Sequence, residues 1–135
     1  MTMTSKEMIF ETLQRMGYNP EIDEDGDIMM YYQMKVIYLF PSRDEDSYIC
    51  MMLPKFYEVA EGRESAVLAA CNKLNRDIRI VKYYIDDDFK SVTATCEFFY
   101  NDNESLECFI EKSLGVIAVV RTLFKREMAE LLKAE

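Results

Sequence analysis

The sequence lacks histidine altogether, has only four glycines, and places no two cysteines within a short motif. Histidine is the commonest general base and metal ligand in proteins, so its absence excludes serine–histidine and cysteine–histidine nucleophilic pairs. No two glycines have the spacing of a phosphate-binding loop, and no Cys-x-x-Cys motif is present for zinc or thiol exchange. We therefore expect a protein that is not an enzyme, uses no cofactor, and has no catalytic or metal-ligating residues to assign.

Positive charge is also scarce, because 16 lysines and arginines stand against 25 aspartates and glutamates, which gives a formal net charge of −9 at pH 7. Nucleic-acid phosphates and anionic membrane surfaces both attract basic proteins, so we expect no nucleic acid and no membrane as a partner. The longest apolar run, residues 116–120, is far too short to span a bilayer. The N-terminal segment has no long apolar stretch either, which predicts no signal peptide and a cytoplasmic location. The acidity itself fits either simple solubility or attraction to a basic partner.

The cysteines, Cys50, Cys71, Cys96 and Cys108, are distant from one another in the sequence. Three of them fall in segments with apolar neighbours, where a thiol packs as a small hydrophobic group. A chain of 135 residues that is 50% hydrophobic has enough apolar material for a core without disulfides. We therefore expect free thiols and a single domain over residues 1–135.

Hydrophobic periodicity predicts an α+β protein in which helices pack on an antiparallel sheet of about five to six strands. A first helix is expected between the capping residue Thr4 and Gly17, where glycine can adopt the left-handed conformation. The Asp-Gly pair at residues 25–26 is a hairpin-turn signal. Residues 28–40 are expected to form two strands that break at 33–35, and residues 48–53 form a further strand that ends before Pro54. A helix is then expected over residues 63–76, followed by strands over 78–85 and 89–100. A long helix begins at Glu104. The order is thus helix, three or four strands, helix, two strands, helix, and short polar turns make consecutive strands antiparallel.

The strand expected over residues 89–100 alternates in polarity. Val92, Ala94, Cys96 and Phe98 share one face, whereas the serine, threonines and glutamate at 91, 93, 95 and 97 share the other. This alternation is typical of a sheet with one face on the core and one face in water.

Two acidic tracts are candidate cation sites. Residues 23–27 resemble the opening of a calcium loop, but Ile28 and Met34 occupy the positions where such a loop needs its glycine and its bidentate glutamate. Residues 86–88 are three consecutive aspartates, and aspartate is also a favoured turn residue because its side chain bonds nearby backbone amides. The turn interpretation is preferred for both tracts, and divalent-cation or small-ligand binding stays as the alternative function.

The last helix carries more apolar surface than one face can hold. Its main apolar stripe should pack on the sheet of the same chain, but Val116, Val119 and Leu123 lie off that stripe on one flank. Leaving them in water forgoes roughly 1.5–3 kcal/mol for each side chain and favours aggregation. We expect a second surface to cover these three side chains. That surface belongs either to another helix of the domain, to the second subunit of a homodimer or to a client protein.

The segment from Ile28 to Tyr32 is apolar or aromatic at every position, and residues 48–53 are similar. The side chains on both faces of such strands must be shielded from water, and the layer of helices shields only one face. The other face needs a partner, or tyrosines that keep their hydroxyls in water. Met29 and Tyr31 are therefore candidate partner or dimer contacts, together with the flank of the last helix.

The chain resembles the YbjN-like family and the wider type III secretion chaperone-like fold. The resemblance rests on the order of elements and on three short motifs, which are residues 25–28 opening an aromatic strand, residues 52–54 before Phe56-Tyr57, and residues 72–75 closing the middle helix. It implies a small acidic cytoplasmic protein that dimerises and, in the chaperone branch, holds an extended segment of a secreted client. No catalytic residue comes with the resemblance.

Taken together, these features predict a non-enzymatic protein-binding module, chaperone-like or regulatory. We expect it to act as a homodimer that covers or holds apolar segments of a client or regulatory protein. The evidence for this prediction is the surplus of apolar surface combined with the absence of catalytic groups.

Overall fold

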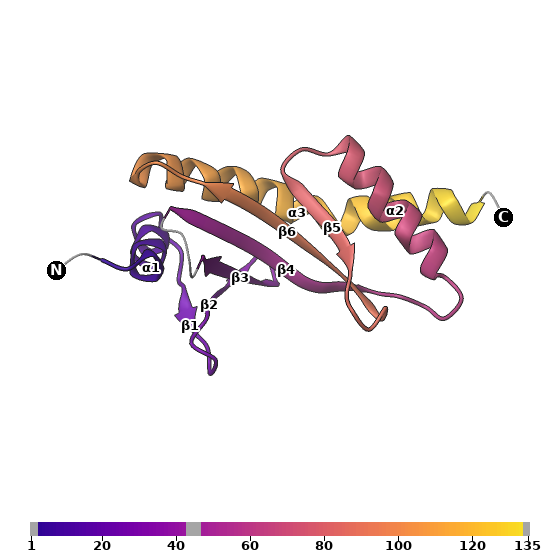
Figure 1. Ribbon diagram of the computed structural model, residues 1–135, viewed down its shortest axis with the longest axis horizontal. Helices are drawn as coiled ribbons and strands as arrows, with labels where there is room; N and C mark the ends of the chain where they lie inside the picture. The colour runs from indigo at the N-terminus through magenta and orange to yellow at the C-terminus, as the bar shows by residue number, and fades with distance from the viewer. Residues whose placement is uncertain (1–2, 43–46, 134–135) are drawn as a thin grey trace.

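The computed structural model describes residues 3–42 and 47–133 (Figure 1). Within these residues the chain forms three helices and six strands. In chain order they are α1 (Ser5–Arg15), β1 (Glu21–Ile22), β2 (Ile28–Tyr32), β3 (Lys35–Pro41), β4 (Tyr48–Glu58), α2 (Glu64–Asp77), β5 (Val81–Ile85), β6 (Ser91–Phe99) and α3 (Asn103–Lys133). No helix in the described ranges combines the length and the hydropathy that crossing a membrane would require.

The strands form one sheet in the order β1-β2-β3-β4-β6-β5, and every neighbouring pair is antiparallel. Helix α3 runs along the length of the molecule, with α1 near one end and α2 beside the other (Figure 1). The α+β class and the expected order of elements are therefore confirmed.

Local sequence signals set several boundaries. The Thr4 hydroxyl accepts a hydrogen bond from the Glu7 backbone N–H at 3.1 Å, which caps the start of α1. Gly17 follows the end of that helix with a φ of 93°, a conformation that glycine adopts at low cost. Gln33 and Met34 both have positive φ and join β2 to β3 in a two-residue turn, at the predicted break.

The predicted end of the fourth strand at Pro54 is wrong. Strand β4 continues to Glu58, and its register against β6 shifts between Leu53 and Tyr57. A bulge tolerates proline because the bulged residues leave the regular ladder of hydrogen bonds. Lys55, with a φ of 46°, instead donates its backbone N–H to the Thr93 hydroxyl at 3.1 Å.

Strand β5 begins at Val81 rather than at the predicted Ile78. Ile78 still belongs to the end of α2, because its backbone N–H donates to the Leu74 carbonyl at 2.9 Å. Ile80 has a φ of 76°, which turns the chain before the strand begins. The β-branched and aromatic composition of residues 78–85 did not reveal this turn.

The core lies on one face of the sheet. Along β2, β3 and β4 every second residue is buried, and these residues include Ile28, Ile37 and Met51. All three helices supply buried side chains to the same hydrophobic cluster. On the helix side the Phe124 ring lies 4.7 Å from the Tyr57 ring and 6.0 Å from the Tyr83 ring, between centroids. The sheet therefore has one face covered by helices.

The prediction that one face of β6 is exposed to water is wrong in the middle of the strand. Thr93 is 3% exposed and Thr95 is 2% exposed, so both faces of the strand are buried there. The side chains of neighbouring strands reach over these small residues, as the contact of Thr93 with Asp86 shows. Phe98, predicted on the dry face, is 43% exposed because it lies near the end of the strand, where it stacks on Phe109.

Candidate protein-binding surface

The face of the sheet opposite the helices is here called the open face. Directly paired residues of antiparallel strands share a face, so the registers of β2, β3 and β4 define its members. Before the bulge of β4 they are Met29, Tyr31, Val36, Tyr38, Phe40, Tyr48, Cys50 and Met52, and the name is kept for these residues; beyond the bulge, Glu58 pairs with Ser91 on the same side of the sheet. None of the side chains before the bulge carries a formal charge, in a sequence of which 30% is charged. All of them are at least partly exposed, whereas the residues that alternate with them along the strands are mostly buried.

Several aromatic rings on the open face and beside it contact one another. The rings of Tyr38 and Phe40 are stacked, with centroids 5.9 Å apart and planes 4° apart. At the end of β6 the Phe99 ring meets the Tyr48 ring edge-on at 5.5 Å. Phe99 is 65% exposed and Tyr31 is 67% exposed. These rings offer broad apolar contact area, and the tyrosines add hydroxyls that can bond to water or to a partner.

Strands β5 and β6 give the open face a polar margin. The Lys82 ammonium lies 3.1 Å from the Glu97 carboxylate across the two strands. Partial desolvation raises the pKa of Glu97, but the hydrogen bonds from Lys82 and Tyr48 and the positive charge of Lys82 together outweigh it and hold the pKa of that carboxyl below its usual value. The two opposite charges neutralise each other within the chain, so this margin adds no net charge to the face.

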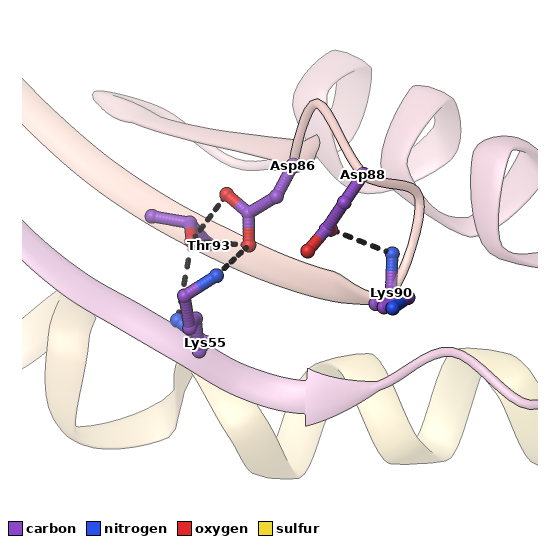
Figure 2. Close-up of polar contacts among 5 residues, drawn as sticks. All are labelled: Lys55, Asp86, Asp88, Lys90 and Thr93. Atoms are coloured by element: carbon purple, nitrogen blue, oxygen red, sulfur yellow. Dashed lines mark hydrogen bonds and ion pairs between the residues drawn. The ribbon is translucent and has the colours of Figure 1, made fainter.

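A second polar group lies at the bulge of β4 (Figure 2). The Thr93 hydroxyl donates to the Asp86 carboxylate, with distances of 3.0 and 3.2 Å to its two oxygens. The Lys55 ammonium lies 3.5 Å from the same carboxylate. In the following turn the Lys90 backbone N–H donates to Asp88 at 2.9 Å, as Figure 2 shows. Asp86 and Asp88 are thus bonded within the β5–β6 turn and its surroundings, as the turn interpretation predicts.

The first acidic tract also has a structural explanation. The carboxylates of Asp23, Asp25 and Asp27 offer ligand atoms within 4.8 Å of one another. However, one oxygen of Asp23 already accepts the backbone N–H groups of Asp25 and Asp27, at 3.0 and 2.8 Å. The Lys6 ammonium donates to the carbonyl of Gly26 in the same turn. Hydrogen bonds from an aspartate side chain to nearby backbone N–H groups are typical of a turn, so the geometry favours a turn.

The structure places the predicted flank of α3 on the other side of the molecule from the open face. Val119 is 45% exposed, whereas Val116 and Leu123 are half-buried against the core. Helix α2 packs against α3, and the ion pair between Lys73 and Glu127 at 3.2 Å joins the two helices. A helix of the same chain therefore covers part of the expected surplus, and Val119 is the most exposed residue of the three.

Two of the contact residues predicted from the sequence, Met29 and Tyr31, lie on the open face. It did not name Tyr38, Phe40, Met52 or Phe99, which extend the same surface. The signal for these residues was present, because the aromatic residues of β3 alternate with Ile37 and Leu39. Without the strand registers, it was not possible to tell that the uncharged positions of three strands meet on one face.

Comparison with known proteins places this geometry in a family. The family described as "YbjN: Putative bacterial sensory transduction regulator" matches residues 5–100. YbjN from E. coli has a similar structure, with a TM-score of 0.63 at 13% identity, covering 89% of this chain and 88% of that chain. No curated protein matches the sequence.

Two further solved structures share the fold. The Yersinia pestis type III secretion chaperone SycH, crystallised with a stable fragment of YscM2, has a TM-score of 0.53 at 10% identity, covering 87% of this chain and 99% of that chain. ExsC in the ExsC–ExsE complex has a TM-score of 0.59 at 14% identity, covering 92% of this chain and 97% of that chain. At these identities the likeness shows the fold, and the predicted type III secretion chaperone-like architecture is confirmed.

Proposed function

We propose that this chain, which belongs to the YbjN family, is a non-enzymatic protein-binding module of a chaperone-like or regulatory kind. It works as a homodimer and holds apolar segments of a partner protein. The observation that carries the proposal is the uncharged open face of β2, β3 and β4. The complexes of SycH with a YscM2 fragment and of ExsC with ExsE support it, because they are complexes of two proteins of this fold with other proteins.

The physical argument is the cost of leaving this face in water. A contiguous patch of exposed apolar side chains is rare on a monomeric protein. Removing it from water contributes about 25 cal/mol for each Å² of apolar area, which opposes the entropy lost on association. The sheet also offers a flat surface whose aromatic rings are held by their neighbours, so little side-chain entropy is lost when a partner binds. Met29 and Tyr31 are proposed contacts on this face, and Val116, Val119 and Leu123 are proposed contacts on the flank of α3.

Suppression of the aggregation of a chemically unfolded model protein tests the function. We expect the wild-type protein to suppress aggregation, and the double variant Tyr31→Glu with Phe99→Glu to lose most of this effect. Both replaced side chains are largely exposed, so the fold should persist, and circular dichroism checks that it does. Because the homodimer is the proposed working form, charge on the open face is harmful whether that face meets a second copy or the partner.

The matched control adds the same charges elsewhere. Leu68, on α2, is 49% exposed and Ile80, after α2, is 47% exposed, and neither lies on β2, β3 or β4. We expect Leu68→Glu with Ile80→Glu to suppress aggregation as the wild type does. A wild-type protein without the effect, or an open-face variant with undiminished effect, would contradict the proposed function.

A further inference from the structure

We propose that the open face is where two copies of this chain meet, sheet against sheet, so that a second copy covers Tyr38, Phe40 and Met52. The inference rests on the proposed function and deepens it, because it assigns the surface that forms the homodimer. In the dimer the second copy occupies the open face, which leaves the proposed contacts on the flank of α3 for the partner protein. Sheets pack face to face about 10 Å apart, and a twofold axis brings the same patch of each copy together. The product has helices outside and two sheets inside.

The distribution of charge favours a second copy of the chain as the molecule that binds the open face. Each chain has a formal net charge of −9, so two copies repel one another unless they meet where charge is absent. The open-face positions of β2, β3 and β4 before the bulge carry no charge, and on the margin Lys82 is paired with Glu97. A basic partner would gain nothing from this uncharged surface, whereas the surface matches itself. An apolar centre with a polar rim is also the usual anatomy of a protein interface.

The flank of α3 is a poorer place for a twofold contact. Positions seven residues apart lie on nearly the same face of a helix, so Lys112 and Arg126 border Val119 at either end. Two α3 helices crossing antiparallel at Val119 would bring Lys112 of each copy beside Arg126 of the other. Like charges facing each other across an interface disfavour it.

The size of the open face also suits a dimer. Strands lie about 4.8 Å apart and rise about 3.4 Å per residue, so β2, β3 and β4 present roughly 400 Å² of sheet, and the margin of β5 and β6 brings the total to roughly 600 Å². Side chains that project from this plane add to the accessible surface. A standard protein interface takes about 800 Å² from each partner, which is the same scale.

Two native cysteines report on this contact without any substitution. Cys50 is half-buried on the open face, opposite Phe40 in the adjacent strand, whereas Cys108 is exposed on α3. Cys71 and Cys96 are buried in the core and should stay unlabelled in the folded protein. A monofunctional thiol reagent at constant pH, followed by peptide mass mapping, gives the rate at Cys50 relative to the rate at Cys108.

Sedimentation velocity and thiol labelling, both run from dilute to concentrated protein, test the inference. We expect a monomer–dimer equilibrium, and we expect the relative labelling rate of Cys50 to fall several-fold as the dimer forms. Tyr38→Glu, at the centre of the face, should raise the dissociation constant of the dimer by about tenfold or more. Tyr31→Glu, at its exposed edge, is a second variant with less risk to the fold. Leu68→Glu adds the same charge on α2 and should leave the dimer intact, and Val119→Glu tests for a contact on α3 instead.

The outcomes separate this inference from the proposed function. A protein that stays monomeric while its open face still suppresses aggregation would overturn the dimer assignment and leave protein binding in place. A dimer that Val119→Glu dissociates and Tyr38→Glu does not would move the contact to α3 and likewise overturn it. A dimer with Cys50 protected but no suppression of aggregation would support the contact and remove the chaperone-like activity.

Discussion

The thiols of Cys71 and Cys96 lie in the core, so each of these residues makes the stability of the fold depend on pH. Burial raises the pKa of Cys71 from 9.0 to about 11 and that of Cys96 from 9.0 to about 12. In the unfolded chain both thiols lose their protons near the ordinary value. Their stabilising contribution is therefore complete below about pH 9 and is lost as the pH rises through the values of the folded state.

We accordingly predict that the free energy of unfolding falls between pH 9 and pH 11, by up to about 1.4 kcal/mol per pH unit for each buried thiol. Urea denaturation at a series of pH values measures this slope. Cys96→Ala should be less stable at pH 7 but should show a shallower alkaline slope. Cys108→Ala, which removes an exposed thiol, should leave the slope as it is in the wild type. An alkaline slope that Cys96→Ala does not change would show that other groups cause it.

At the scale of elements, helix α2 protects the edge of the sheet. The side chain of Asn75 donates to the Tyr83 carbonyl at 3.0 Å and accepts the Tyr83 backbone N–H at 2.7 Å. An amide side chain thus takes the place of a neighbouring strand along β5. Unpaired strand edges invite pairing with other chains, and this contact removes the opportunity at Tyr83.

Asn75→Ala should therefore lower the free energy of unfolding by about 1–2 kcal/mol, because two backbone groups lose their partners. It should also increase aggregation on standing, since the edge of β5 becomes available for pairing. Asn72→Ala, which changes an exposed residue one turn earlier on α2, is the matched control and should have little effect. Urea denaturation and light scattering measure the two effects. Equal stability in the two variants would mean that the edge contact contributes nothing.

At the scale of the whole molecule, net charge controls self-association. Two copies with a formal charge of −9 repel one another through solution, whereas the proposed contact itself is uncharged. Salt screens repulsion beyond about 10 Å at 0.1 M ionic strength. We predict that added sodium chloride lowers the dissociation constant of the dimer several-fold, measured by sedimentation velocity.

The control for this prediction reduces the charge at a distance from the open face. Glu104→Gln with Glu111→Gln, both on α3, should tighten the dimer at low salt and flatten its dependence on salt. A dimer that weakens as salt is added would instead indicate contacts between opposite charges. That result would argue against the open face, where the described strands β2, β3 and β4 present no charged side chain before the bulge of β4.

The sequence predicted correctly those helix ends and turns that depend on the conformation of one or two residues. Thr4 as a cap, Gly17 as a helix end and the turn at Gln33 and Met34 all follow from the conformations that those residues allow. The aspartate tracts were correctly interpreted as turns for the same reason. Boundaries that depend on a neighbouring strand were missed, because Pro54 is tolerated only where β4 bulges against β6.

The sequence by itself determined the class of fold and the shortage of catalytic groups, because periodicity and composition act residue by residue. It also showed that Met29 and Tyr31 belong to a strand with two apolar faces. Only the tertiary structure decided where surplus apolar surface remains. Packing of α2 against α3 covers part of the flank of α3 and leaves Val119 exposed, whereas the strand registers gather uncharged residues on one side of the sheet. These are contacts between segments distant in the chain, and no local pattern specifies them.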